Sequence, residues 1–250
     1  MKNQEIKKVW IDEYKIHSYE IDVKGNVTLP MLCNFMQESA WHHAENLGVG
    51  YSHLIRNKLS WVLAQQLIKI DTFPKWNETI RIHTWPSGRG RLSYFRDFKI
   101  LNSKDDIIGV AVAVTKWYAI NLMDRKPQNI DHKFYYDLSN VEQACTHQLS
   151  KLVPLNLANH TKSFQVSYSN LDLNDHVNNV TYVEWILDSI PLDFQRSHQL
   201  KELEIIYLAE ALYDDELKSY LEKGANSTYD HRLVRDKDQK EICRARTKWD

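Results

Sequence analysis

Polar residues that could do chemistry alternate over a short segment in the second half of the chain. Asp172, Asn174 and His176 stand directly before an apolar stretch with helical spacing, which predicts a helix over residues 177–190. An imidazole can take a proton from water near neutral pH, an amide can polarise a carbonyl, and a carboxylate can orient the group or attack. The first N–H groups of the helix would face this segment and could stabilise an oxyanion. The segment therefore predicts a site that activates water.

Each of these residues has a simpler interpretation when it is taken alone. Asp and Asn before a helix most often cap the helix or form a turn, and a single histidine is usually structural or exposed. The density of polar and ionisable groups over residues 168–179 is what favours chemistry. His42 and His43 do not make a comparable metal site, because adjacent histidines on a helix point to different sides.

Composition excludes several classes of protein. The 250 residues carry a formal net charge of −1, which does not favour a general nucleic-acid binder that neutralises phosphates. The most apolar stretch, residues 107–120, is interrupted by Lys116, and no signal-peptide-like run follows the start. The three cysteines are widely spaced and fit neither a disulfide framework nor a zinc site. We therefore expect a cytoplasmic protein that does not span a membrane.

The chain consists of two similar halves. In the first, a strand at residues 14–21 precedes a helix that begins near Thr28 and ends near Gly48. Four further strands are predicted at residues 59–71, 79–85, 92–101 and 107–120. In the second half, a strand at residues 163–168 precedes the predicted helix, and four strands follow at residues 202–210, 216–222, 228–235 and 242–249. One long helix beside consecutive antiparallel strands must bury its apolar face on their sheet, which predicts an α+β fold.

A polar stretch without a sustained period separates the two halves. We predict a first domain at residues 1–125, a linker at residues 126–160 and a second domain at residues 161–250.

Two segments are similar to a known enzyme family. Residues 172–189, DLNDHVNNVTYVEWILDS, resemble the signature of acyl-acyl-carrier-protein thioesterases. Residues 200–211, LKELEIIYLAEA, resemble the strand of this family that ends in a catalytic glutamate, here Glu210. Plant members follow that glutamate with a cysteine, whereas this chain has Ala211, which favours acid-base chemistry over a Cys-His mechanism. Further likenesses at residues 29–48, 85–99 and 121–127 extend the resemblance over nearly the whole chain.

The resemblance implies a fold, a reaction and a partner. The fold would be a tandem, or double, hotdog, in which each half is a long helix wrapped by an antiparallel sheet. The substrate would be the thioester of a fatty acyl-phosphopantetheine on acyl carrier protein, and no cofactor or metal is implied. The catalytic residues would all lie in the second half, namely Asp172, Asn174, His176 and Glu210.

The first half has no matching Asp-x-Asn-x-His before its helix, and the resemblance implies that this half lines the pocket for the fatty chain. Met31, Phe35, Met36 and Trp41 are candidates, for which ordinary packing of the helix on the sheet is the alternative.

The sequence leaves two routes and several functions open. Glu210 and His176 could activate water while Asn174 and helix N–H groups hold the carbonyl oxygen and Asp172 orients the set. A carboxylate could instead attack and form a transient anhydride. The alternatives in function are an acyl-CoA thioesterase, a hydratase and a non-catalytic acyl-binding protein. A homodimer is one expectation, although two hotdogs in one chain could replace the dimer that single ones form.

Overall fold

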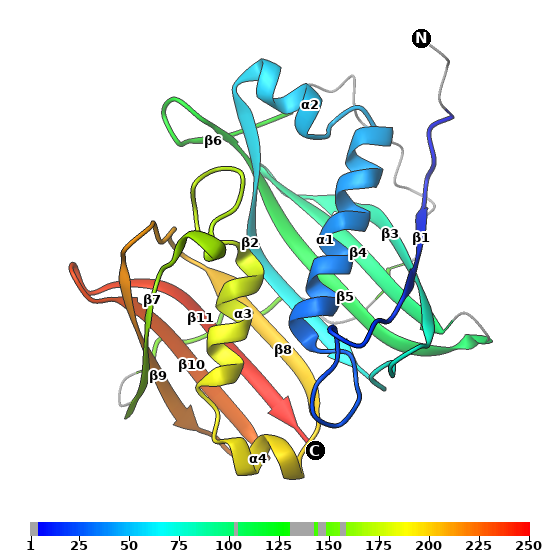
Figure 1. Ribbon diagram of the computed structural model, residues 1–250. Coiled ribbons are helices and arrows are strands. Elements are labelled where there is room, and N and C mark those ends of the chain that lie inside the picture. Colours follow the sequence, from blue (N-terminus) through cyan, green and yellow to red (C-terminus); the bar gives the residue numbers. More distant parts are fainter. Residues whose placement is uncertain (1–4, 103–104, 131–142, 145–148, 156–158) are drawn as a thin grey trace. The chain divides into compact units, whose positions relative to one another are not determined.

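The computed structural model describes residues 5–102, 105–130, 143–144, 149–155 and 159–250 (Figure 1). The chain divides into two compact units. The first unit is Met1–Ala64 with Asp71–Gln148, and the second is Gln65–Ile70 with Leu149–Asp250. Much of the predicted linker at residues 126–160 lies outside the described residues, and the predicted domain boundaries stay a prediction.

The first unit is an antiparallel sheet in the order β1–β3–β4–β5, with β6 paired to β5. Its strands are β1 (Trp10–Lys15), β3 (Thr79–Arg89), β4 (Ser93–Asn102), β5 (Asp105–Asn121) and β6 (Pro127–Gln128). Its helices are α1 (Leu29–Asn46), α2 (Tyr51–Leu54) and the short 3-10 helix η1 (Ile55–Asn57). β2 (Leu59–Ile70) belongs to this unit up to Ala64 and to the second unit from Gln65.

Helix α1 begins and ends where the sequence predicts. The Thr28 hydroxyl accepts a hydrogen bond from the Met31 N–H at 3.3 Å, and Pro30 occupies the first turn, where no N–H is needed. Gly48, at φ 73°, follows the C-terminal end, where a left-handed conformation suits glycine. The helix therefore has local start and stop signals in the sequence.

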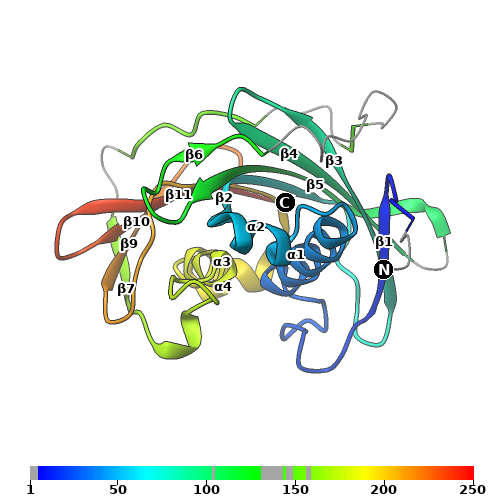
Figure 2. The same ribbon diagram turned by 90° about the horizontal axis from the view of Figure 1, so that it is seen from above.

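The apolar face of α1 packs on the sheet of the first unit (Figures 1 and 2). Ile82 and Ile100 face each other across β3 and β4 and are fully buried. Phe35 is buried and stacks on Tyr14 with ring centroids 4.5 Å apart, whereas Trp41 is 41% exposed. Helix-to-sheet packing thus accounts for Phe35, one of the residues considered for the acyl pocket.

The second unit repeats the arrangement. Its strands lie in the order β8–β11–β10–β9–β7, and the last part of β2 pairs antiparallel with β8. These strands are β7 (Asn159–Gln165), β8 (Leu200–Tyr207), β9 (Glu216–Lys223), β10 (Thr228–Arg235) and β11 (Lys240–Trp249). Its helices are the 3-10 helix η3 (Tyr168–Asn170), α3 (Asn179–Asp188) and α4 (Leu192–Ser197). In each unit a helix packs on an antiparallel sheet, which confirms the predicted α+β hotdog architecture.

Several predicted elements differ at their ends; the strand predicted at residues 163–168, for example, is β7, Asn159–Gln165. The first strand is β1, Trp10–Lys15, rather than residues 14–21, and β8 ends at Tyr207, before Glu210. The predicted helix at residues 177–190 is shorter as α3 because Val177 pairs with Leu171 in an isolated β-bridge. The ends of these elements depend on hydrogen bonding to segments elsewhere in the chain or across a loop, and the hydrophobic periodicity of the sequence contains no information on such pairing.

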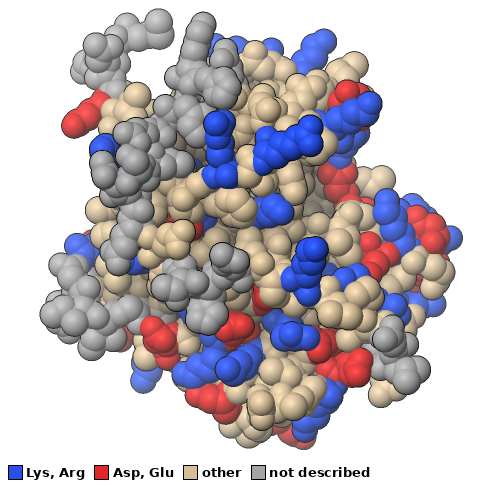
Figure 3. Space-filling view, turned by 180° about the vertical axis from the view of Figure 1, so that it is seen from behind, with Lys and Arg blue, Asp and Glu red and all other residues tan. Residues whose placement is uncertain are grey.

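From Arg244 to Trp249 on β11, partly or fully exposed residues alternate with buried ones, as expected for a sheet that has one face in solvent. Figure 3 shows basic and acidic side chains interspersed on the face seen from behind. In the second unit, Arg246 Nε lies 2.6 Å from Asp230 Oδ1 across β10 and β11. None of the helices among the described residues is both long and apolar enough to cross a membrane.

A histidine is buried in the core of the second unit. His231 on β10 has no exposed surface, its Nε2 lies 3.0 Å from Thr247 Oγ1, and Thr247 Oγ1 also accepts the Trp249 indole N–H at 3.0 Å. Its Nδ1 has no hydrogen-bond partner among the described residues. Burial lowers the pKa of His231 from its ordinary 6.5 to about 3, so the imidazole is neutral in the folded protein.

This buried histidine makes stability depend on pH. As pH falls from 6.5 toward about 3, the unfolded chain binds a proton at His231 that the folded protein does not. The contribution of His231 is therefore complete above pH 6.5 and is lost at about 1.4 kcal/mol per pH unit below it. Urea unfolding between about pH 4 and about pH 7 should show a steeper loss for the wild type than for His231→Gln. Parallel curves would contradict this assignment.

Candidate active site

The loop that carries the predicted residues is shaped by the Asp172 carboxylate. Its Oδ1 accepts the N–H of Asn174 at 2.7 Å and the N–H of His176 at 3.3 Å. The Asp172 N–H donates to the His176 carbonyl at 2.8 Å, and Asp175 makes the turn at φ 60°. Such side-chain-to-backbone bonds are the usual way in which an aspartate closes a short turn. The loop therefore places His176 at a defined point before α3.

The start of α3 offers fewer free N–H groups than the sequence suggested. Asn178 caps the helix, its side-chain oxygen accepting the Val180 N–H at 2.9 Å. Four backbone N–H groups near this end already have acceptors. The Val180 N–H donates to the cap side chain, and three others donate to backbone carbonyls, namely the N–H groups of Val177, Asn178 and Thr181. The loop and the cap thus use several donors at this end, and the role of helix N–H groups in holding a substrate oxygen stays a prediction.

His176 and Glu210 come together in the second unit. His176 Nε2 lies 3.3 Å from Glu210 Oε2, with the side chains 21% and 38% exposed respectively. An imidazole beside a carboxylate can take up a proton while the negative charge stabilises the imidazolium that forms. Both groups are partly open to solvent, so a ligand can approach them. This pair is the strongest acid-base arrangement among the predicted residues.

The segment after β8 holds Glu210 by its backbone. The Arg235 guanidinium donates to the Glu210 carbonyl at 3.1 Å, and the Ala211 N–H donates to the Tyr182 hydroxyl at 3.0 Å. The Val177 N–H donates to the Ala211 carbonyl at 3.0 Å and so joins this segment to the loop before α3. Tyr182 and Arg235 were not predicted as site residues, since neither stands near Glu210 in the sequence.

The other two predicted residues lie on the same loop but not in the pair. Asn174 is exposed, and its side-chain amide has no hydrogen-bond partner within the described part of the chain. The Asp172 carboxylate accepts its hydrogen bonds from backbone N–H groups of the described residues. The structure thus brings His176 and Glu210 into contact, leaves the Asn174 amide open to a ligand and commits Asp172 to the loop.

Two further titratable groups near the site stay neutral. Burial raises the pKa of the Tyr182 phenol, which is 2% exposed, and burial likewise raises the pKa of the Cys243 thiol. A protonated buried thiol is a poor nucleophile. Cys243 therefore supplies no thiolate to this site, and the position after Glu210 is Ala211, which has no thiol.

Both halves of the chain match models of one protein family. Residues 7–138 match the acyl-ACP thioesterase N-terminal domain, and residues 156–250 match the acyl-ACP thioesterase C-terminal domain. A palmitoyl-acyl carrier protein thioesterase of chloroplasts from Gossypium hirsutum is 30% identical over 263 residues, covering 96% of this chain and 63% of the relative. The chain therefore spans a little under two thirds of that relative's length.

Two solved structures share the fold. An acyl-ACP thioesterase from Bacteroides thetaiotaomicron superimposes with a TM-score of 0.88 at 24% identity, covering 97% of this chain and 98% of that one. A 12:0-ACP thioesterase from Umbellularia californica superimposes with a TM-score of 0.87 at 22% identity, covering 98% of each chain. At these identities the likeness supports the double hotdog fold that the sequence predicted.

Proposed function

Because the chain belongs to the acyl-ACP thioesterase family, we propose that it hydrolyses the thioester of a fatty acyl-acyl carrier protein to a free fatty acid and the carrier thiol. The observation that carries the proposal is the 3.3 Å contact between His176 and Glu210 in the unit that matches the family's C-terminal domain. The exposed Asn174 amide on the same loop supports it, since a thioester carbonyl needs a donor.

The proposed reaction is acid-base catalysis with water as the nucleophile. His176 takes a proton from water as the water oxygen bonds to the thioester carbon, and Glu210 stabilises the imidazolium. The Asn174 amide donates to the oxyanion, and this kind of donor contributes about 3–4 kcal/mol to transition-state stability. The carbon–sulfur bond then breaks, and the thiolate takes the proton from His176. The products are a fatty acid and a thiol, and no cofactor is used.

The carrier is tested by comparing substrates with one acyl chain. We expect kcat/KM to be about tenfold or more higher for acyl-acyl carrier protein than for acyl-coenzyme A, because a protein carrier adds contacts that steer association. Thiol release measured with a chromogenic thiol reagent checks this.

Equal or better turnover of acyl-coenzyme A would favour an acyl-CoA thioesterase. Addition of water to an enoyl thioester without thiol release would indicate a hydratase, and acyl binding without turnover would indicate a non-catalytic protein. A homodimer and a cytoplasmic location remain predictions from the sequence.

His176 is tested by replacement with alanine. His176→Ala should lower kcat about 10²- to 10⁴-fold, the usual range for a positioned acid-base group, with little change in Tm. His160→Ala is a matched control, because His160 is an exposed histidine of the same unit whose Nε2 lies 3.2 Å from Ser163 Oγ, on the same strand. Near-normal turnover of His176→Ala would refute the proposed role.

A further inference from the structure

The loop before α3 has a close copy in the first unit. Asp22 Oδ1 accepts the N–H groups of Lys24 at 2.8 Å and Asn26 at 3.0 Å, and the Asp22 N–H donates to the Asn26 carbonyl at 2.7 Å. Asp172 makes the same three bonds at 2.7, 3.3 and 2.8 Å. Equivalent residues of the two loops are separated by a constant 150 positions (172 − 22 = 150).

The surroundings of the two loops also correspond. Gly25, at φ 78°, takes the place of Asp175, at φ 60°. An isolated bridge joins Ile21 to Val27 in the first unit, as another joins Leu171 to Val177 in the second. Each loop leads into a helix whose first turn is capped by a side chain, from Thr28 or from Asn178. The backbone scaffold is therefore the same in both units.

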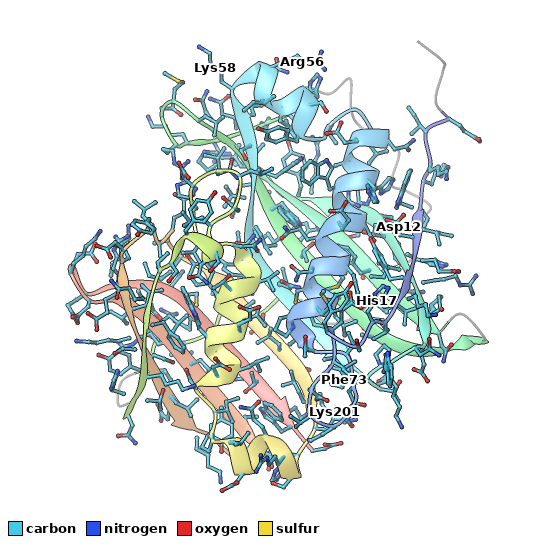
Figure 4. The ribbon with its side chains drawn as sticks, viewed as in Figure 1. Asp12, His17, Arg56, Lys58, Phe73 and Lys201 are labelled. Atoms are coloured by element: carbon cyan, nitrogen blue, oxygen red, sulfur yellow. The ribbon has the colours of Figure 1, made fainter. Side chains whose placement is uncertain are left out.

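The side chains available for chemistry differ between the two copies. Asn26 takes the place of His176, and Lys24 takes the place of Asn174. The Val27 N–H donates to the Pro74 carbonyl at 2.7 Å, as the Val177 N–H does to the Ala211 carbonyl. Phe73, which is labelled in Figure 4, therefore occupies the position equivalent to Glu210. The first unit therefore keeps the aspartate of the loop without the imidazole and the glutamate.

We infer that Asp172 is a positioning residue that builds the loop, and that it is neither the nucleophile nor the proton carrier of the reaction. In the first unit Asp22 makes the same hydrogen bonds although Asn26 and Phe73 stand in the places of His176 and Glu210, so the shape of the loop accounts for the aspartate. In the second unit its Oδ1 is committed to two backbone N–H groups. The inference rests on the proposed function and selects the water route over the anhydride route.

The test compares Asn and Ala replacements in both copies. Asp172→Asn keeps an oxygen that can accept both N–H groups, so we expect kcat within about tenfold of the wild type and an unchanged pH profile. Asp172→Ala leaves both N–H groups without their acceptor, and it should lower Tm and reduce kcat further than the Asn variant does. Asp22→Ala should lower Tm about as much as Asp172→Ala does, Asp22→Asn should lower it less, and both should leave kcat unchanged.

A loss of about 10³-fold or more in Asp172→Asn with normal Tm would overturn the inference, since that scale belongs to a group that takes part in the chemistry. A second measurement is a single turnover in heavy-oxygen water followed by mass analysis of the Asp172 peptide. We expect label in the fatty acid and none in the peptide, whereas label in the peptide would show carboxylate attack. Absence of thioester hydrolysis by the wild type would refute the proposed function instead.

A separate observation concerns Tyr182. Its buried hydroxyl accepts the Ala211 N–H at 3.0 Å, directly beside Glu210. The first unit has Leu32 at the equivalent helix position and Pro74 at the position equivalent to Ala211 after the strand, so both the hydroxyl and the N–H are missing there. The two groups occur together only in the copy that carries Glu210. We propose that Tyr182 positions Glu210 against His176.

Tyr182→Phe leaves the buried Ala211 N–H without its acceptor, and we expect kcat to fall about tenfold with KM nearly unchanged. The double variant Tyr182→Phe/Glu210→Gln should be no slower than Glu210→Gln alone, because positioning has no effect once the carboxylate is gone. Tyr229→Phe, at another buried tyrosine of this unit, is the control and should keep normal kcat. Normal kcat in Tyr182→Phe, or additive effects in the double variant, would overturn this proposal.

Discussion

The hydrogen bond from the Val177 N–H to the Ala211 carbonyl is the interaction on which the site depends. It ties the loop before α3 to the segment after β8, two parts of the second unit that are distant in sequence. The imidazole of His176 and the carboxylate of Glu210 each stand one residue before the bonded residues, and they meet at 3.3 Å. A backbone bond of this kind is insensitive to side-chain identity, so the same connection can serve a copy of the loop that has no catalytic pair.

The two units show one scaffold used in two ways. Asp22 and Asp172 close the same turn with the same backbone bonds, whereas the positions of His176 and Glu210 are taken by Asn26 and Phe73 in the first unit. Residues common to both copies maintain the fold of the loop, and residues present in one copy serve a function of that copy. On the inference drawn above, Asp172 is a structural carboxylate and Glu210 a chemical one, although both lie in segments that resemble the family.

Helix α3 holds its part of the site because both of its ends are attached. Asn178 caps the first turn, and the Ser189 hydroxyl at the last turn donates to Ser219 on β9 at 2.6 Å while the helix buries Val183 and Ile186. A helix fixed in this way keeps the Tyr182 hydroxyl at a constant position. Buried polar groups that are hydrogen-bonded in this manner fix one position of the helix on the sheet, whereas apolar contacts alone would allow several.

The sequence by itself determined the order of elements, the ends of α1 and the loop at Asp172. These follow from local periodicity and from caps and turns whose partners are a few residues away. Tertiary structure decided that α3 begins at Asn179, that Tyr182 and Arg235 hold the Glu210 segment, and that Asp22 repeats the loop. These features depend on hydrogen bonds between segments that are distant in the sequence. Because nearly every residue has a backbone N–H and carbonyl, residue type does not predict which of these groups will pair. The contact of His176 with Glu210 could be expected from a family resemblance, but only the pairing of the loop with the segment after β8 brings the two groups together.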